Sequence, residues 1–516
     1  MALSRGGFVV ERLVSAVLLS FVLVPACSGA SQPDLGDEEP ATEDDGTPDD
    51  GELPMPKPAV DGPCKGHTPK ALPAPLSRLT NAEYRNTLRD LLPGVTLPEL
   101  DLPSENVVEG FDNQASTQTP SPALIERYAK NARTVAEAAT AKLNELAGCQ
   151  PSSRDEEASC GARFVERFGQ RAFRRPLTDE ETTRWRGYFD AELAAGGFAT
   201  AMSSTLQAFL QAPQLVYRIE RGDGALDPYA LASRLSYFVW DSTPDAALLE
   251  AARSGALATT DGVRTQAKRL LADPRAHEAI ARFHAQWLRF SKMDEMRKDG
   301  ALFPEFDDAL TATMKASAER FVDHVFWEGG RLEGLLTGSF AFVDPRLARL
   351  YGATPPASAG ALTKIDLPPE RRGGGIMTQA GLLAGFGHAT MDAPVLRGIF
   401  VLDRLMCERP PAAPADVVTT LAEPAPDDAP MTTRQRFEAE HQIGTCKNCH
   451  EVIDGIGFGF SHYDAVGQWR DRDNGLPVDA RGQIVGTDVE GPFDGAPELG
   501  RKLAGSENVQ RCVTKQ

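Results

Sequence analysis

Two cysteines and a histidine near the carboxyl end stand at a spacing that could do chemistry. Cys446, Cys449 and His450 form the pattern C-x-x-C-H within GTCKNCHEVIDGIGFGF, residues 444–460. With 8 Cys and 8 His in 516 residues, chance would give this pattern on the order of 0.002 times per chain. Two thiols at this spacing match the vinyl groups of a porphyrin, and the imidazole beside them can ligate its iron. The motif therefore predicts haem c, with thioether bonds at both cysteines and His450 as the proximal ligand.

Two other chemistries remain open for the same motif. Zinc could bind Cys446, Cys449 and nearby histidines, but a zinc ribbon needs a second cysteine pair at similar spacing, which this sequence lacks. A disulfide or another structural role is the third alternative. Glycines 455, 457 and 459 follow the motif and would let the backbone lie close to a flat cofactor, which favours haem.

A second axial ligand for the iron is not obvious, because no methionine follows residue 431. His388 and Met391 lie three residues apart in GHATMDAPVLRG and would share a face if that segment is helical. His441 and His462 lie nearer the motif in the sequence. For each of these side chains, a surface position or a hydrogen-bonded role is the simpler alternative.

The segments on either side of the motif would have to position it. TTRQRFEAEH, residues 432–441, is predicted to form a helix that buttresses the site with Phe437 on its inward face. Downstream, Arg470 in SHYDAVGQWR is a candidate partner for a haem propionate, because its guanidinium fork matches a carboxylate. Residues 476–495, LPVDARGQIVGTDVEGPFDG, are predicted to form a small β-hairpin region.

The amino-terminal segment indicates the compartment. Basic residues precede an apolar run of about 12 residues, which suits a signal peptide and is too short to span a bilayer. We therefore expect a signal peptide over residues 1–26. Cleavage before Cys27 would resemble lipoprotein processing, in which that cysteine is lipidated, with simple secretion as the alternative. Either way the mature chain is predicted to be exported to the periplasm or cell envelope, with at most a lipid anchor in the membrane.

Residues 27–63 are predicted to be an acidic, disordered tether. Eleven Asp or Glu residues stand against one Lys between positions 31 and 63, with no aromatic residue. Such a segment cannot bury enough apolar surface to offset the entropy of ordering. Eleven acids less one base account for ten of the 19 formal negative charges of the chain. No basic patch with interleaved aromatic residues is present, which excludes nucleic acid as an expected partner.

The remaining chain is predicted to be mainly α-helical and too long for a single core. Thr80 with Glu83, and Thr178 with Glu181, are spaced as capping boxes before helical patterns. Three further helix starts combine a capping side chain with a proline: Asp227-Pro228, Thr243-Pro244 and Asp273-Pro274.

The other cysteines suggest disulfides in an exported protein. Cys149 and Cys160 are close enough in the sequence to close a small loop, and Cys407 and Cys512 flank the C-x-x-C-H region. Cys64 has no obvious partner.

Several stretches resemble, in order, the planctomycete-type cytochrome C family, in which helical domains of unknown function (PSD-type modules) precede a cytochrome-like module. The resemblance covers roughly residues 76–514. It is carried by RLTNAEYRNTLRDLL from Arg78, GFDNQ from Gly110, FRRPLTDEE from Phe173, LASRLSYFVWDSTPDAALL from Leu231, FVDPRLARLYG from Phe342, and GIMTQAGLLA through APVLRG to the motif.

The resemblance implies an exported, multi-helical body followed by a cytochrome c-like module that carries a small β-hairpin. We expect helical domains over residues 64–150, 151–225 and 226–355, and the cytochrome c-like domain over 356–516. Family members often continue CHxxMDPxGF, whereas this chain has Ile453 and Gly455 in the Met and Pro positions and ends at RCVTKQ.

The function predicted from these observations is electron transfer by one haem c, with another exported redox protein as partner. If the chain is an enzyme, it is an oxidoreductase or its electron-transfer component, since no G-x-S-x-G, phosphate-loop or H-E-x-x-H motif indicates another class. The alternative is a binding or scaffold lipoprotein of the cell envelope, in which the C-x-x-C-H segment is structural or binds zinc.

Overall fold

The computed structural model describes residues 76–220, 226–357, 360–411, 429–441 and 446–516. The predicted signal peptide over 1–26, lipidation at Cys27 and the tether over 27–63 lie outside the described residues, as does Cys64. Within these ranges, no helix combines the length and apolar character needed to cross a bilayer.

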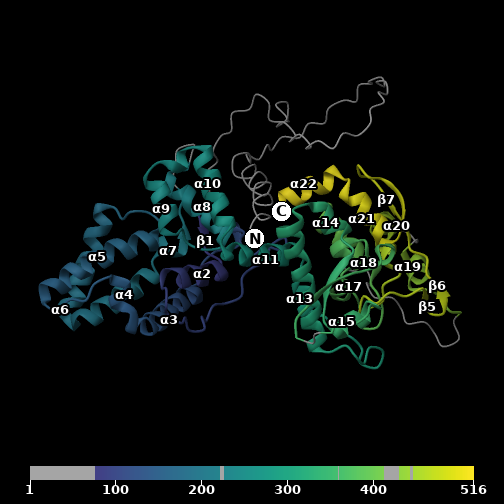
Figure 1. The fold of residues 1–516 in the computed structure, drawn as a ribbon, viewed down its shortest axis with the longest axis horizontal. Coiled ribbons are helices and arrows are strands. Elements are labelled where there is room, and N and C mark those ends of the chain that lie inside the picture. The colour runs from purple at the N-terminus through teal and green to yellow at the C-terminus, as the bar shows by residue number, and fades with distance from the viewer. Residues whose placement is uncertain (1–75, 221–225, 358–359, 412–428, 442–445) are drawn as a thin grey trace, which may run out of the picture.

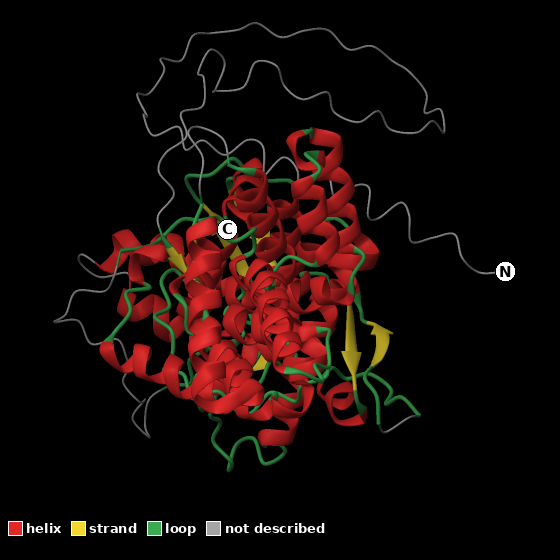
Figure 2. Cartoon of the chain, turned by 90° about the vertical axis from the view of Figure 1, so that its left-hand side faces the viewer, coloured by secondary structure: helices red, strands yellow, loops and turns green. Residues whose placement is uncertain are grey.

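The described chain is mainly α-helical, which confirms the predicted fold class (Figure 2). Its strands pair only in small antiparallel sheets of two strands each. Figure 1 shows two helical lobes, one built from the first half of the chain and one from the second, with α11 (Pro274–Trp287) between them.

Residues from 77 to 218 form one packing unit of the first lobe. Its buried residues run from Leu79 to Val216 and make a single apolar core, to which Tyr237 of the next helix also belongs. The expected segments 64–150 and 151–225 thus share a core, because α5 packs against both α4 and α6. The elements are β1 (Ser77–Arg78), α2 (Asn81–Leu91), α3 (Pro122–Ala138), α4 (Leu143–Ala147), α5 (Arg154–Phe173), α6 (Asp179–Leu210), α7 (Pro213–Val216) and β2 (Tyr217–Arg218), which pairs with β1.

The helix starts follow the capping pattern in the sequence with one exception. Both capping boxes form, at the starts of α2 and α6. Asp227 and Asp273 cap α8 (Pro228–Trp240) and α11, each with proline in the first turn. The start expected at Thr243-Pro244 was wrong: α9 (Ala246–Arg253) begins two residues later, because the side chain of Asp245 accepts the hydrogen bond from the backbone of Leu248.

Helices α8, α9 and α10 (Thr260–Leu271) enclose a small separate core. Helix α11 follows and packs against α8 of the first lobe and α13 (Asp308–His324) of the second. The expected segment 226–355 is therefore divided between the lobes, because residues from Trp287 onward contribute to the core of the second lobe.

The second lobe has one large core, with buried residues from Trp287 to Val509, and Phe111 of the GFDNQ stretch also belongs to it. Its C-terminal hairpins pair as β5 with β6 and β7 with β8, as the sequence predicted. The further elements are α12 (Ser291–Glu295), α14 (Leu332–Thr337), β3 (Phe340–Val343), α15 (Pro345–Leu350), β4 (Thr363–Asp366), α16 (Pro369–Arg372), α17 (Ala380–Gly385), α18 (Pro394–Phe400), α19 (Thr433–His441), α20 (Cys446–Gly457), β5 (Arg472–Asp473), β6 (Leu476–Pro477), β7 (Arg481–Ile484), β8 (Gly491–Asp494), α21 (Gly495–Ala504) and α22 (Glu507–Lys515).

Arg282 of α11 joins three segments at the junction of the lobes. Its guanidinium donates to Asp241 at 2.8 Å and to Asp112 at 2.7 Å. One turn further on, the indole of Trp287 donates to the carbonyl oxygen of Arg404 in the second lobe at 2.8 Å. Gly110 has a φ of +95°, and a Cβ there would lie 2.9 Å from the Arg404 guanidinium. The GFDNQ stretch is therefore part of the contact between the lobes.

Candidate functional site

The C-x-x-C-H motif opens helix α20. Cys446 and Cys449 lie three residues apart, so they share one face of the helix, and His450 lies four residues after Cys446 on the same side. Both cysteines are half-buried free thiols. Cys449 also packs against the large core of the second lobe. The helix thus presents two thiols and one imidazole from a single surface.

The other four cysteines within the described ranges form disulfides. Cys149 bonds to Cys160, with their Cα atoms 6.0 Å apart, and Cys407 bonds to Cys512, with their Cα atoms 5.4 Å apart. These are the two pairs that the sequence suggested. The second disulfide ties α22 to the segment that follows α18, so the end of the chain is fastened to the second lobe.

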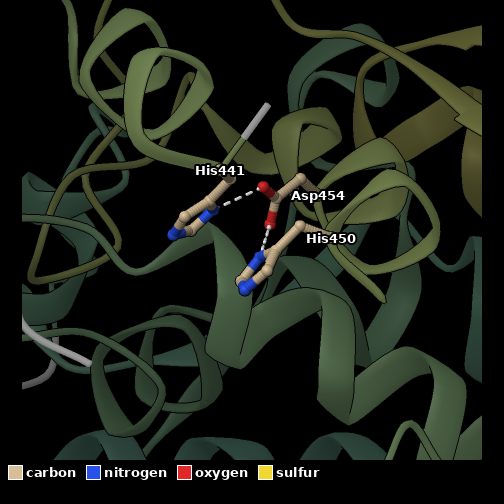
Figure 3. Close-up of side chains that lie close together, drawn as sticks. All are labelled: His441, His450 and Asp454. Atoms are coloured by element: carbon tan, nitrogen blue, oxygen red, sulfur yellow. Dashed lines mark hydrogen bonds and ion pairs between the residues drawn. The ribbon is translucent and has the colours of Figure 1, made fainter. Parts of the chain in front are cut away.

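Asp454 holds two imidazoles at once (Figure 3). Its Oδ1 lies 3.1 Å from Nδ1 of His450, one turn earlier on α20, and its Oδ2 lies 2.7 Å from Nδ1 of His441, at the end of α19. The two imidazole rings lie against each other, with centroids 3.6 Å apart and planes inclined by 35°. Together these three side chains form the His–Asp–His cluster, whose possible ligand atoms lie within 4.8 Å of one another.

The electrostatics of the His–Asp–His cluster keep the carboxylate ionised. Burial by itself raises the pKa of Asp454, but the hydrogen bonds from His441 and His450 outweigh burial and leave that pKa below its usual value. An ionised carboxylate only accepts hydrogen bonds, so each histidine carries its proton on Nδ1. Both Nε2 atoms lie on the side of the rings away from Asp454 (Figure 3).

Helix α19 is anchored at its start and packed at its end. The backbone N–H of Thr433 donates to Asp473 at 2.5 Å. Arg434 donates to the carbonyl oxygen of Arg481 at 2.6 Å, which ties α19 to β7. At the other end, the buried ring of Phe437 lies 5.1 Å from the ring of His441. Phe437 therefore faces inward, as expected, and buttresses His441.

The guanidinium of Arg470 is held by carboxylates of the chain itself. It donates to Asp392 at 2.7 Å and to Asp473 at 2.9 Å, and both of these acids are buried. Since both amino groups are engaged, the geometry argues against the propionate contact expected from the sequence. Arg470 instead links the segment before α18 to the residue that anchors α19.

The glycines after the motif approach other parts of the chain and not an open face. A Cβ at Gly455 would lie 2.8 Å from the carbonyl oxygen of Gln483 in β7, and one at Gly457 would lie 2.2 Å from that of Pro394 in α18. A Cβ at Gly459 would lie 2.5 Å from the ring of Phe493. The expectation that these glycines make room for a flat cofactor was therefore wrong, because close packing within the lobe takes up that space.

His388 and Met391 do not share a helical face. They belong to a turn in which the backbone N–H of His388 donates to the carbonyl oxygen of Met391 at 2.9 Å. The next helix, α18, begins only at Pro394. The segment is therefore not helical, and His388 and Met391 do not form the pair of candidate ligands that a helix would have placed on one face.

His462 belongs to a different place in the second lobe. It lines a cavity of about 500 Å³ between α16 and α21, together with Trp469. The two rings are stacked, with centroids 4.2 Å apart and planes inclined by 4°. The Nδ1 of His462 donates to the carbonyl oxygen of Arg470 at 2.8 Å. None of the three residues of the His–Asp–His cluster lines this cavity.

Four family models match successive parts of the chain, and together they cover more than half of it. In chain order they are PSD3 (protein of unknown function, DUF1587) over 77–141, PSD5 (DUF1595) over 160–220, PSD4 (DUF1592) over 226–353 and PSCyt3 (DUF1588) over 372–473. The chain belongs to the planctomycete-type cytochrome family with PSD modules. No curated protein and no solved structure matches it.

The PSCyt3 match of this family member contains α18, α19 and α20, and with them the motif and the His–Asp–His cluster.

Asp454 was not predicted from the sequence. Its spacing of four residues after His450 was a usable signal, since residues at i and i+4 of a helix are neighbours. The contact of His441 with the same carboxylate had no such signal, because it depends on how α19 packs beside α20.

Proposed function

We propose that this family member is an exported haem c protein that transfers single electrons, with Cys446 and Cys449 bonded to the porphyrin and His450 bound to the iron. The observation that carries the proposal is the pairing of two free thiols on α20 with an imidazole whose Nδ1 is held by Asp454. No hydrogen bond to Nε2 of His450 is present among the described residues, so the ligating atom is open. The PSCyt3 match over the same helix supports a cytochrome-like domain.

The donor set fits the requirements of haem c. Haem, when bound, would supply reversible one-electron redox chemistry. The chain supplies two sulfur atoms at the required spacing, and Asp454 fixes the orientation and the tautomer of His450. Metal-ligating histidines almost always have such a partner on their second nitrogen. We assign no sixth ligand, because His388 and Met391 lie in a turn and His462 lines a separate cavity.

The proposed location is outside the cytoplasm, and the proposed partner is another exported redox protein. Disulfides persist in oxidising compartments, and Cys149–Cys160 and Cys407–Cys512 support such a location. We propose further that the chain is a lipoprotein lipidated at Cys27, with its signal peptide over residues 1–26 removed. The lipid anchor would hold the protein at the membrane surface.

The test is to express the full chain with its own leader in a bacterium that has a cytochrome c maturation system. We expect a Soret band, one haem per chain in the pyridine haemochrome assay, and haem that stays on the chain in a denaturing gel. The Cys446→Ala/Cys449→Ala variant should lose all three signals. The matched control is Cys149→Ser/Cys160→Ser, which removes two sulfur atoms of the other lobe and should keep its haem. A colourless wild-type protein from a strain that matures other c-type cytochromes overturns the proposal.

A second candidate is a scaffold protein that binds a metal ion without porphyrin. The observation that favours it is the His–Asp–His cluster, whose ligand atoms lie within 4.8 Å of one another, since imidazole and carboxylate are zinc ligands. The same preparation separates the two functions. Stoichiometric zinc in a colourless protein, lost in a His441→Ala variant, favours the scaffold.

A further inference from the structure

We propose that Asp454 lowers the reduction potential of the iron site by accepting the Nδ1–H of His450, and that His441 limits this effect by sharing the same carboxylate. The inference rests on the proposed function, because it concerns the haem that His450 would hold. It assigns positioning roles to two residues that do not themselves ligate the metal.

The two oxygen atoms of the Asp454 carboxylate are hydrogen-bonded to different histidines. Oδ1 of Asp454 faces His450 at 3.1 Å and Oδ2 faces His441 at 2.7 Å, so the shorter hydrogen bond goes to the histidine outside the motif. The side chain of Asp454 is only 8% exposed. Water therefore screens its negative charge poorly, and that charge acts mainly on the two imidazoles that are hydrogen-bonded to it.

A carboxylate at Nδ1 changes the iron through the ring. Accepting that hydrogen bond leaves more electron density on the imidazole and raises the basicity of Nε2, the atom that would bind iron. A more basic ligand stabilises the more highly charged, oxidised iron relative to the reduced iron. Hydrogen bonding around the axial ligand is one of the means by which proteins set haem potentials. Asp454 should therefore favour the oxidised state.

His441 is hydrogen-bonded to the same carboxylate. Its Nδ1–H donates to Oδ2, which reduces the share of the charge that Asp454 offers to His450. Removal of this donor should strengthen the hydrogen bond between Asp454 and His450 and lower the potential further. The two roles thus predict shifts of opposite sign. Simple loosening of the site would instead admit water, which favours the charged, oxidised iron in either variant, so it would lower both potentials.

The experiment compares matured, haem-loaded full-length wild type with Asp454→Asn, Asp454→Glu and His441→Phe. Phenylalanine keeps a ring against Phe437 and His450 but cannot donate. Haem content is measured first by the pyridine haemochrome assay, and the midpoint potential then by spectroelectrochemical titration. We expect Asp454→Asn to raise the ratio of reduced to oxidised protein at a fixed applied potential about tenfold, which is about 59 mV for one electron. His441→Phe should lower that ratio about threefold, and Asp454→Glu should restore most of the wild-type value.

The outcomes separate the inference from the proposed function. A wild type without haem overturns the proposed function, and the inference falls with it. Haem-loaded variants with unchanged potentials, or with potentials that both fall, overturn the inference alone. If Asp454→Asn does not retain haem, a potential of His441→Phe that rises or stays the same still contradicts the shared-carboxylate role.

Discussion

Arg470 and the buried Asp392 form an ion pair although 78 residues separate them, with 2.7 Å between Nη2 and Oδ1. Burial raises the pKa of Asp392, and the positive charge of Arg470 opposes that rise. The other amino group of Arg470 lies 2.9 Å from Asp473, which in turn accepts the backbone N–H of Thr433. This chain of contacts fixes where α19 begins, and α19 carries His441.

Replacing Arg470 with Met should destabilise the second lobe by about 3 kcal/mol, because the buried Asp392 would lose its hydrogen-bonded cation and keep only the more distant charge of Arg397. The free energy of unfolding is measured by urea titration followed by near-UV circular dichroism. The double variant Arg470→Met/Asp392→Asn is the control and should recover a large part of the loss, since it removes both charges together. Equal stability of the single variant and the wild type would show that the pair is not needed.

Gly457→Ala should destabilise the packing of α20 on α18 by about 1–3 kcal/mol, the usual cost of overpacking. The added methyl group would lie 2.2 Å from the carbonyl oxygen of Pro394, so the two helices would have to separate. The matched control is Gly187→Ala in α6, where no atom lies within 4 Å of the added Cβ. That change should raise stability slightly, because glycine is unfavourable inside a helix. Thermal unfolding of both variants measures the difference, and a neutral Gly457→Ala contradicts the close approach.

His284 should make the stability of the protein fall in mild acid. Burial lowers the pKa of this imidazole to about 4, and the free side chain titrates near 6.5. Since the unfolded chain binds the proton more readily, stability is present above pH 6.5 and is lost as the pH falls towards 4. About 2 kcal/mol should be lost between pH 7.5 and pH 5.

The measurement for His284 is urea unfolding at several pH values for wild type and His284→Gln. The variant should lose this part of the pH dependence, whatever its absolute stability. Glu319 and Asp323 line the same small pocket and are present in both proteins, so the comparison isolates the change at residue 284. Parallel pH curves for the two proteins would contradict the assignment.

The two disulfides should contribute unequally to stability. They close loops with sequence separations of 11 for Cys149–Cys160 and 105 for Cys407–Cys512. By the chain-entropy relation, removing them costs about 3 and about 5 kcal/mol, respectively. Paired Cys→Ser variants of each bridge, unfolded thermally beside the wild type, measure the order. A larger loss from the first pair would mean that native-state contacts outweigh loop entropy at these sites.

The sequence by itself determined the local features of this protein. The capping boxes at Thr80 and Thr178 and the Asp-Pro caps at 227 and 273 depend on atoms within one turn of helix, so their spacing is sufficient to predict them. The two thiols and the imidazole of the motif share a helix face for the same reason. The small C-terminal hairpins were also readable, because alternation and turn residues are local signals.

Only the tertiary structure decided how these parts meet. His441 reaches Asp454, and Arg470 reaches Asp392, because helices remote in the sequence pack together in the second lobe. Gly457 serves a helix contact for the same reason. Such contacts depend on the summed burial of the large core and not on the spacing of a few residues. The sequence therefore predicted which residues could hold a haem c, and the fold decided which carboxylate is hydrogen-bonded to His450.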